Sequence, residues 1–426
     1  MKNRFELKAI DYCLSVRDGT HDSPKQVLIG GKPLVTTRHI DNGNINFDKT
    51  YNINEKDYEA INKRSKVDKW DVLISMIGTV GEVHLVDYIP NYAIKNLGLF
   101  KVGKELEAKW LYYYLESKIG KNNIKYLLQG STQQYISLQS LRKLPILVAK
   151  NEIEKEKIIF FLSLMDSKIK LNLKIKKTLE NILVSMFKSW FVDFDPTRAK
   201  TETRTTRLSK EISDLFPDSF EQTELGEIPK GWSYKSIYED LEVIYGAPFS
   251  SNKFNSSNKG IPLIRIRDLK NQKTNIYTEE IHPKGVLIKQ GDVVVGMDAE
   301  FKPYLWSGEN AWMNQRICKF IPKNNLCSTF IIETLKKQLR FIELTEVGTT
   351  VIHLGRSDIN KFLILNEKNG VINKFNQICK PIEKKIITNS FETRKLKEIK
   401  NLLLTKLISG DLKISYEEKK MMSSGF

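Results

Sequence analysis

The chain has 426 residues, of which 41% are hydrophobic and 10% aromatic, so it carries enough apolar material for two or three globular domains. Its formal net charge of +17 favours an anionic partner such as nucleic acid, although a general lysine bias would give the same sign. Four cysteines without a Cys-x-x-Cys pair argue against a disulfide framework or a zinc site, and no apolar run is long enough for a membrane span, so we expect a cytoplasmic protein without a membrane partner.

The first 150 residues contain short runs of Val, Ile, Leu and Tyr separated by Asn, Gly and Pro, which is typical of strands. We predict strands over residues 32–40, 71–76 and 97–102, and an amphipathic helix over residues 110–117. This mixture predicts an α+β domain built on a mixed sheet.

A long helix is predicted from Asn151 to Phe191, because this segment has neither Gly nor Pro and shows a heptad seam. At 1.5 Å per residue it would be roughly 60 Å long. The seam residues are Ile158, Leu162, Met165, Ile169, Asn172, Lys176, Leu179, Leu183, Met186 and Trp190.

A polar, proline-containing and unperiodic segment follows and predicts a linker over residues 196–221. Beyond it, the landmarks of the first domain recur in the same order. They pair as Gly31–Ile40 with Gly260–Leu269, Asp71–Met76 with Asp292–Met297, and Gly130-Ser131-Thr132 with Gly348-Thr349-Thr350. Residues 330–337 predict a helix that corresponds to the one over residues 110–117.

A second long helix is predicted from about Val371, and its seam repeats the first. The seam residues are Phe375, Cys379, Ile382, Ile386, Asn389, Thr393, Leu396, Lys400, Leu403 and Leu407. One helix cannot bury a narrow stripe alone, so we expect the two helices to pair with each other as an antiparallel coiled coil. Asn172 would then lie near Thr393 and Asn389 near Lys176, fixing the register at some cost in stability, unless these positions lie at the exposed edge of the stripe.

The predicted fold is therefore a pseudo-twofold internal repeat of the α+β class, in which two similar mixed α/β domains are separated by two long antiparallel helices. The predicted boundaries are 1–150 for the first domain, 151–195 for the first spacer helix, 196–221 for the linker, 222–370 for the second domain, 371–412 for the second spacer helix and 413–426 for a tail. Two similar modules at a fixed separation suit two half-sites along double-stranded DNA.

Two segments carry a resemblance to a known family. Thr178–Pro196 resembles the end of the central helix of specificity subunits of type I restriction-modification systems, and Glu224–Trp232 is similar to the segment that opens their second target-recognition domain. The order of domains and helices extends the resemblance over the whole chain. It implies a non-catalytic subunit that reads a two-part, asymmetric DNA target, one half per target-recognition domain.

The same resemblance implies partners. The helices would dock methyltransferase (modification) subunits, and a restriction/translocase subunit would join the complex. S-adenosylmethionine, ATP and Mg would belong to those partners, so no cofactor is expected in this chain. Phe187, Trp190, Phe191 and Phe194 are candidate partner-docking residues, or alternatively they close the helix pair against a recognition domain.

Base-reading side chains are expected in the two domains, because Arg can pair with guanine and Asn or Gln with adenine. The candidates lie in the polar loops after Gly130 and Gly348, near Arg38 and Arg265, and at two matching positions of the repeat, around Asn96 and Gln315. We expect these two arginines to lie on strands of alternating polarity, so that one face presents their side chains. Arginines that lie two residues apart on one strand face, such as Arg265 and Arg267, more often bind phosphates or carboxylates than bases. The full set is Thr36, Thr37, Arg38, Lys95, Asn96, Ser131, Thr132, Gln133, Gln134, Arg265, Arg267, Asn314, Gln315, Arg316, Thr349, Thr350, His353 and Arg356.

An enzyme is one alternative class. The sequence has no Asn/Asp-Pro-Pro-aromatic loop of an amino-methyltransferase and no Gly-x4-Gly-Lys-Ser/Thr phosphate loop. Asp292, Glu300 and Lys302 resemble a nuclease metal site, but residues 71–84 of the other copy lack the carboxylate-x-Lys unit, which favours solvated loop charges. The other alternative is a non-selective structural double-stranded DNA-binding protein, for which two near-identical modules would be expected, whereas these differ in their polar loops.

Overall fold

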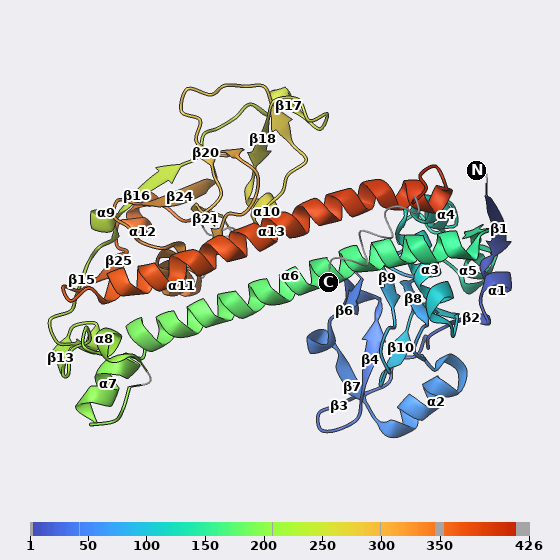
Figure 1. Ribbon diagram of the computed structural model, residues 1–426, viewed down its shortest axis with the longest axis horizontal. Helices are drawn as coiled ribbons and strands as arrows, with labels where there is room; N and C mark the ends of the chain where they lie inside the picture. The colour runs from blue at the N-terminus through green and yellow to red at the C-terminus, as the bar shows by residue number, and fades with distance from the viewer. Residues whose placement is uncertain (1–2, 42, 207, 299, 346–352, 415–426) are drawn as a thin grey trace. The chain divides into compact units, whose positions relative to one another are not determined.

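A computed structural model of the chain describes residues 3–41, 43–206, 208–298, 300–345 and 353–414 (Figure 1). The chain divides into two compact units, the first formed by residues 1–168 with 396–426 and the second by residues 169–395. Each unit therefore contains one of the repeated domains together with parts of both long helices. No helix in these described ranges is long and apolar enough to cross a membrane.

The domain of the first unit is built on an antiparallel and a mixed sheet. The antiparallel sheet has the order β2-β11-β8-β9, with strands Ser15–Asp18, Leu97–Lys101, Val72–Ser75 and Val83–Leu85. The mixed sheet has the order β10-β4-β7-β3, with strands Ala93–Lys95, Lys32–Thr36, Tyr51–Ile53 and Gln26–Val27, and β10 runs parallel to β4. Shorter antiparallel pairs join β1 (Arg4–Lys8) to β12 (Pro145–Ala149) and β5 (Ile40–Asp41) to β6 (Asn44–Ile45). The three predicted strands are confirmed as β4, β8 and β11.

The domain of the second unit repeats this topology. Its antiparallel sheet has the order β16-β24-β21-β22, with strands Leu241–Tyr245, Ile317–Pro322, Val293–Gly296 and Pro303–Leu305. Its mixed sheet has the order β17-β19-β18-β23-β20, with strands Phe254–Asn255, Tyr277–Thr278, Ile261–Ile264, Ala311–Met313 and Leu287–Ile288, and β23 runs parallel to β18. Antiparallel pairs join β15 (Ser233–Ser236) to β25 (Leu363–Asn366) and β13 (Phe220–Thr223) to β14 (Gly226–Pro229). Apart from the additional edge strand β20, the repeat in the sequence is thus a repeat of strand order and direction.

Short helices accompany the sheets. In the first unit they are α1 (Ala9–Tyr12), η1 (Thr37–His39), η2 (Phe47–Lys49), α2 (Glu55–Ser65), α3 (Glu105–Glu116), α4 (Lys118–Tyr126) and α5 (Leu138–Lys143). In the second unit they are α7 (Asp195–Thr201), α8 (Lys210–Ser213), α9 (Ile237–Asp240), η3 (Ser251–Lys253), α10 (Ile266–Leu269), α11 (Ser328–Thr345) and α12 (Arg356–Ile359). The helix predicted over residues 110–117 is confirmed in α3 up to Glu116, and the helix predicted over residues 330–337 is confirmed within α11.

The two long helices are α6 (Glu152–Phe191) and α13 (Val371–Ser409), as predicted, and Figure 1 shows them side by side with opposite directions. In the first unit the Lys400 ammonium binds the carboxylate of Asp166. In the second unit Asn172 Nδ2 donates to Glu392 Oε2 at 2.8 Å. Within each unit, later residues of one helix therefore meet earlier residues of the other, and the antiparallel pairing is confirmed.

Polar residues do occupy the seam. Asn172, Asn389 and Thr393 are all buried, so they do not lie at an exposed edge of the stripe. The amide of Asn172 bonds to Glu392, the residue beside the expected neighbour Thr393. A carboxylate accepts the amide hydrogen more strongly than a hydroxyl does, which favours this one-residue difference.

The predicted linker is folded. Residues 196–221 contribute most of α7, all of α8 and the start of β13, and Phe216 is buried in the core of the second unit. The ring of Phe216 packs edge-on against Trp190, with centroids 5.2 Å apart. The segment therefore contains short elements and a buried aromatic anchor that its polar composition did not predict.

Candidate nucleic-acid interface

The first group of candidate residues lies on a helical turn, which corrects the expected strand. Strand β4 ends at Thr36, and Thr37 and Arg38 belong to η1. The backbone N–H of Thr36 donates to His39 Nδ1 at 3.0 Å, and this cap turns the chain out of the strand. Burial lowers the pKa of His39, which keeps Nδ1 available as an acceptor.

The second unit makes the same turn with a different cap. Arg265 ends the extended segment, and its backbone N–H donates to Asp268 Oδ2 at 3.0 Å at the start of α10, which holds Arg267. The Arg265 guanidinium also bonds to this carboxylate, with Nε 3.0 Å from Oδ2. Arg265 is therefore held as a carboxylate partner, whereas Arg38 and Arg267 are exposed.

In the first unit, Lys95 and Asn96 lie beside the turn that begins after Thr36. Lys95 is paired with Thr36 in the parallel register of β10 and β4, and its ammonium donates to Ser23. Asn96 adopts a left-handed backbone with φ of 56°, and its Oδ1 lies 3.0 Å from His21 Nδ1. The other ring nitrogen of His21 lies 3.0 Å from Asp18 Oδ2. The amide of Asn96 is thus oriented by a histidine that the sequence analysis did not single out.

The matching residues of the second unit form a charged cluster. The N–H of Asn314 donates to Ile264 O at 3.1 Å, beside the parallel pair β18–β23. Asp298 joins two further candidates: its Oδ2 lies 3.6 Å from Arg316 Nε, and its Oδ1 lies 2.6 Å from His353 Nδ1. Gln315, which lies between Asn314 and Arg316 in the sequence, is exposed. Asp298 was missed because a lone aspartate after a strand gives no sequence signal.

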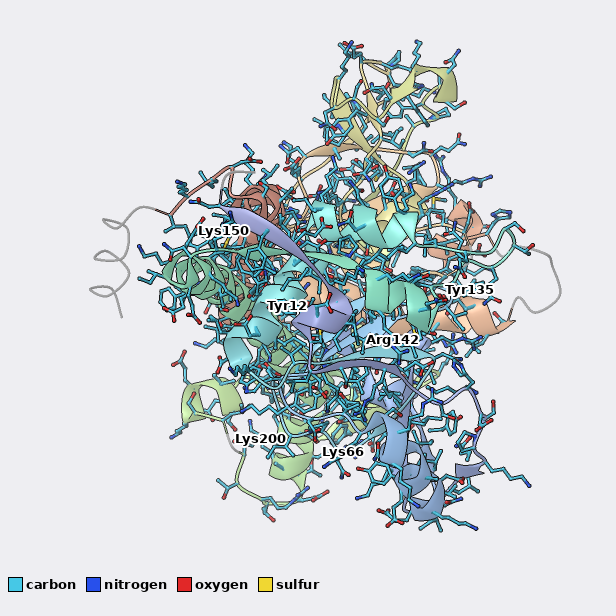
Figure 2. All side chains as sticks on the ribbon, turned by 90° about the vertical axis from the view of Figure 1, so that its right-hand side faces the viewer. Tyr12, Lys66, Tyr135, Arg142, Lys150 and Lys200 are labelled. Atoms are coloured by element: carbon cyan, nitrogen blue, oxygen red, sulfur yellow. The ribbon has the colours of Figure 1, made fainter. Side chains whose placement is uncertain are left out.

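The polar loop of the first unit is an exposed turn with a fixed base. Gln129 and Tyr135 exchange backbone hydrogen bonds of 2.8 and 2.9 Å, and residues 131–134 between them are exposed. In Figure 2, Tyr135 is labelled near α5, which follows this loop. A Cβ on Gly130 would lie 2.4 Å from Gln133 O, so this turn requires a glycine. The candidates Ser131, Thr132, Gln133 and Gln134 all lie on this turn.

The segment predicted as the corresponding polar loop of the second unit is only partly described. Thr349 and Thr350 lie outside the described residues. Beyond the loop, Arg356 begins α12, and its Cζ lies 4.6 Å from the ring centroid of Tyr245. This cation–π contact leaves the Arg356 side chain exposed.

Three strand ends bring the candidates of each domain together. In the first unit the N–H of Met76 donates to Asn96 O, and Ile136, just after the loop, donates to Met76 O at 2.9 Å. In the second unit Met297 donates to Arg316 O at 2.9 Å and accepts from Leu354 at 2.8 Å. We call these regions the convergent ends, formed around Thr36, Lys95, Asn96, Met76 and Ile136 in the first unit and around Ile264, Asn314, Arg316, Met297 and Leu354 in the second.

Two glycines that the sequence analysis missed allow this convergence. A Cβ on Gly19 would lie 2.4 Å from Ile94 O, and a Cβ on Gly246 would lie 2.1 Å from Asn314 O. Each glycine follows the first strand of its antiparallel sheet and lets the chain cross the parallel pair. Their matching places in the repeat were the signal that could have identified them.

The nuclease-like interpretation of Asp292 is not supported by its contacts. Asp292 Oδ2 accepts from Lys319 Nζ at 3.1 Å, just as Asp71 Oδ2 accepts from Lys101 Nζ at 2.7 Å. Burial raises the pKa of Asp71, and the lysine opposes this shift. No three His, Cys, Asp or Glu side chains in the described part of the chain gather as metal ligands. The two aspartates form equivalent ion pairs that hold the turns before β8 and β21.

The aromatic cluster at the end of α6 is packed inside the second unit. Phe187, Trp190, Phe191 and Phe194 are between 3% and 8% exposed. Phe191 packs edge-on against Phe330 and Phe375, with centroids 5.1 and 5.0 Å apart. This burial favours closure of the helix end against its domain over a partner-docking surface.

Comparison with known sequences gives a consistent result. A family model described as the type I restriction modification DNA specificity domain matches residues 26–181 and 229–365, more than half of the chain. The specificity subunit of the HindI type I restriction enzyme of Haemophilus influenzae is 26% identical over 336 residues, which cover 67% of this chain and 72% of that protein. The MjaIX specificity subunit of Methanocaldococcus jannaschii is 28% identical over 330 residues, which cover 72% and 69% of the two chains.

A solved structure shares the fold. The S subunit of a type I restriction-modification system from M. genitalium aligns over 95% of this chain and 96% of its own, with a TM-score of 0.55 and 16% identity. The duplicated domains and long helices described above are therefore an arrangement found in another protein.

Proposed function

Since the chain belongs to the family of type I restriction-modification specificity subunits, we propose that it selects a two-part sequence in double-stranded DNA, with each domain reading one half. One observation carries this proposal. The two domains share strand order, turns and ion pairs, yet their convergent ends carry different polar side chains: an Asn, Lys and Gln set in the first unit and an Asn, Gln, Arg and His set in the second. A shared frame with different hydrogen-bonding groups suits two different half-sequences.

The proposal assigns catalysis to partners. The chain would contribute binding and selection, while methyltransferase subunits supply S-adenosylmethionine and a restriction/translocase subunit supplies ATP and Mg chemistry. The ion pairs of Asp71 and Asp292 support this division, because each carboxylate is bound by a lysine. Purified chain alone should neither methylate nor cleave DNA, and methyl transfer in proportion to its concentration would contradict the assignment.

We propose that methyltransferase subunits dock on an exposed stripe of α6. Ile153, Phe160 and Leu164 recur at spacings of seven and four residues and are 62%, 50% and 38% exposed. This spacing places them on one face of the helix, in the manner of a second coiled-coil seam. Phe160→Lys should weaken assembly with the methyltransferase, as measured by size-exclusion chromatography, whereas Lys170→Gln, an exposed position on a different face of the same helix, should not.

The central test changes the polar loop of one domain. In the complex with its methyltransferase, Gln133→Ala combined with Gln134→Ala should relax or alter one half of the methylated sequence, because only the first domain loses amide donors and acceptors. Sequencing of the modified bases measures this. Asn91→Ala, exposed at the opposite end of β10, is the control. Equal modification of all sequences by the unaltered complex would favour the non-selective alternative.

Salt dependence supplies an independent test. If lysines and arginines neutralise several phosphates, affinity should fall by orders of magnitude between roughly 50 and 200 mM salt. The formal charge of +17 supports this expectation. A flat dependence would contradict a phosphate-binding role.

A further inference from the structure

Large apolar side chains lie exposed beside the convergent end of each domain. Tyr126, the last residue of α4, is 87% exposed, while Phe341 and Leu344 near the end of α11 are 66% and 57% exposed. Both domains have substantial cores that bury other aromatic residues, so the exposure of these three side chains does not reflect the lack of a core. An exposed apolar cluster next to polar candidate residues points to a contact surface.

The two sets occupy the same place in the repeat. Tyr126 stands four residues before Gly130, and Leu344 stands four residues before Gly348. Four residues span at most about 14 Å of chain, so Tyr126 lies within reach of any ligand that touches the exposed loop after Gly130. Each domain thus places an apolar residue near the end of a helix, ahead of the segment that the sequence predicts as its polar loop.

Tertiary contacts hold both helix ends against the convergent ends. In the first unit a Cβ on Gly81, in the turn after β8, would lie 3.6 Å from Ile124 Cγ2 of α4. In the second unit the N–H of Phe301, after β21, donates to Glu343 Oε1 of α11 at 2.6 Å. The helix ends are therefore packed against the turns that follow Met76 and Met297.

The exposed faces of these helices are basic. On α4 the exposed residues Lys118, Lys121 and Lys125 recur at spacings of three and four, and this helix contains no acidic residue. On α11 the basic residues Lys336, Lys337 and Arg340 are exposed; the Lys336 ammonium pairs with the partly buried Glu333, and Arg340 pairs with the partly buried Glu343 at 2.9 Å. In such a helix the basic side chains can bind phosphates of the DNA backbone, and the apolar side chain at the helix end can contact bases.

From these observations we infer that α4 and the second half of α11 are a further DNA-binding element of each domain. Their lysines and arginine contact phosphates, and Tyr126, or Phe341 with Leu344, makes apolar contact with bases in the groove. The occupant is double-stranded DNA, which places this inference on the proposed function. It adds to the polar loops a contact that depends on apolar area and therefore not on salt.

The test uses the full chain assembled with its methyltransferase and a duplex that carries both half-sequences. Tyr126→Ser should weaken binding about tenfold, as expected for loss of one aromatic contact with a base, without changing the salt slope. Lys125→Gln should instead lower the slope by about one unit, because it removes one phosphate contact. Phe341→Ser with Leu344→Ser should reproduce the Tyr126→Ser effect for the second half-sequence.

Ile89→Ser is the control, because Ile89 is also 87% exposed in the first unit but lies in the loop ahead of β10, away from Lys95 at its far end. Thermal unfolding of each variant checks that the fold is retained. If a sequence-selective complex binds equally well with Tyr126→Ser and with Ile89→Ser, the inference is overturned. It is also overturned if Tyr126→Ser lowers assembly with the methyltransferase while the assembled complex binds DNA normally. A complex without any sequence selectivity would instead contradict the proposed function itself.

Discussion

In the first domain the helix that leads toward the polar loop is broken into α3 and α4, whereas in the second domain α11 runs without interruption. Ser117 makes the break: its hydroxyl accepts from Gly120 N at 3.1 Å and donates to Tyr114 O at 2.6 Å. In α11 the side chain of Gln338 instead bonds to both backbone groups of Leu363, at 2.7 and 2.9 Å. The two domains thus place the end of this helical segment at matching positions of the repeat, but the segment is bent in the first domain and continuous in the second.

The largest expected effect is at the break. A Cβ on Gly120 would lie 2.2 Å from Tyr114 O and 2.8 Å from Leu115 Cα. The backbone cannot yield cheaply, so this overlap outweighs the gain of about 1 kcal/mol that Gly→Ala gives in a helix. Gly120→Ala should lower the free energy of unfolding by about 3 kcal/mol in chemical denaturation. Asn122→Ala, exposed on the same helix, should change the free energy of unfolding by less than about 0.5 kcal/mol. Equal losses of stability in the two variants would contradict the close contact between Gly120 and the end of α3.

The ends of the long helices form a second contrast. In the first unit the buried Arg4 caps α13, with Nε 2.8 Å from Ile408 O and a terminal nitrogen 2.9 Å from Leu407 O. In the second unit Trp232 packs instead against Phe191 at the end of α6, with ring centroids 6.1 Å apart. A charged cap and an aromatic cap therefore serve equivalent positions.

Replacing the charged cap should be costly. Arg4→Met keeps much of the volume but leaves two buried carbonyls without their donor and removes the partner that Glu154 Oε1 has at 3.0 Å. We expect the free energy of unfolding to fall by about 2 kcal/mol. Lys8→Met on the same strand is exposed and serves as the control. If Arg4→Met proved as stable as the control, carbonyl capping would not stabilise this helix end.

Features with a local signal were predictable from the sequence. The heptad spacing predicted both long helices and their pairing, and short apolar runs predicted β4, β8 and β11. Features that depend on contacts between distant residues were not. Phe216 folds the expected linker by packing against Trp190.

The candidate site shows the same division. Residue type alone predicted the polar loop and Asn96 as candidates, but it did not predict their hydrogen-bond partners. Arg265 is bound by the cap that Asp268 provides, and His21 orients Asn96 across 75 residues of sequence. The close approach of Gly246 to Asn314 likewise joins segments far apart in the chain. Such partners become visible only when the fold brings them together.

The caps of the two turns differ in their response to pH. Burial lowers the pKa of His39 below its ordinary value of 6.5, so the neutral ring is stabilised in the folded chain. The stabilisation is complete above pH 6.5 and is lost as the pH falls below this value toward the lower folded pKa. His39→Asp, which copies Asp268 of the second unit, should remove this dependence.

Between pH 7.5 and 5.5 the unaltered chain should therefore lose more stability than the His39→Asp variant. Thermal unfolding at each pH measures the difference, and all other residues are the same in the two proteins. Parallel pH profiles for the two proteins would show that the cap does not depend on a neutral His39.

The smallest expected effect separates the two asparagines of the helix seam. Asn172 donates to Glu392, whereas Nδ2 of the buried Asn389 has no hydrogen-bond partner within the described residues. Burying an amide without a partner costs free energy, so Asn389→Leu should raise the free energy of unfolding by about 0.5 kcal/mol or more. Asn172→Leu should not, because it removes a bond to a carboxylate. Chemical denaturation of both variants decides the matter. A gain from Asn172→Leu equal to that from Asn389→Leu would mean that the Glu392 bond adds nothing to the pairing, and that both asparagines weaken the seam alike.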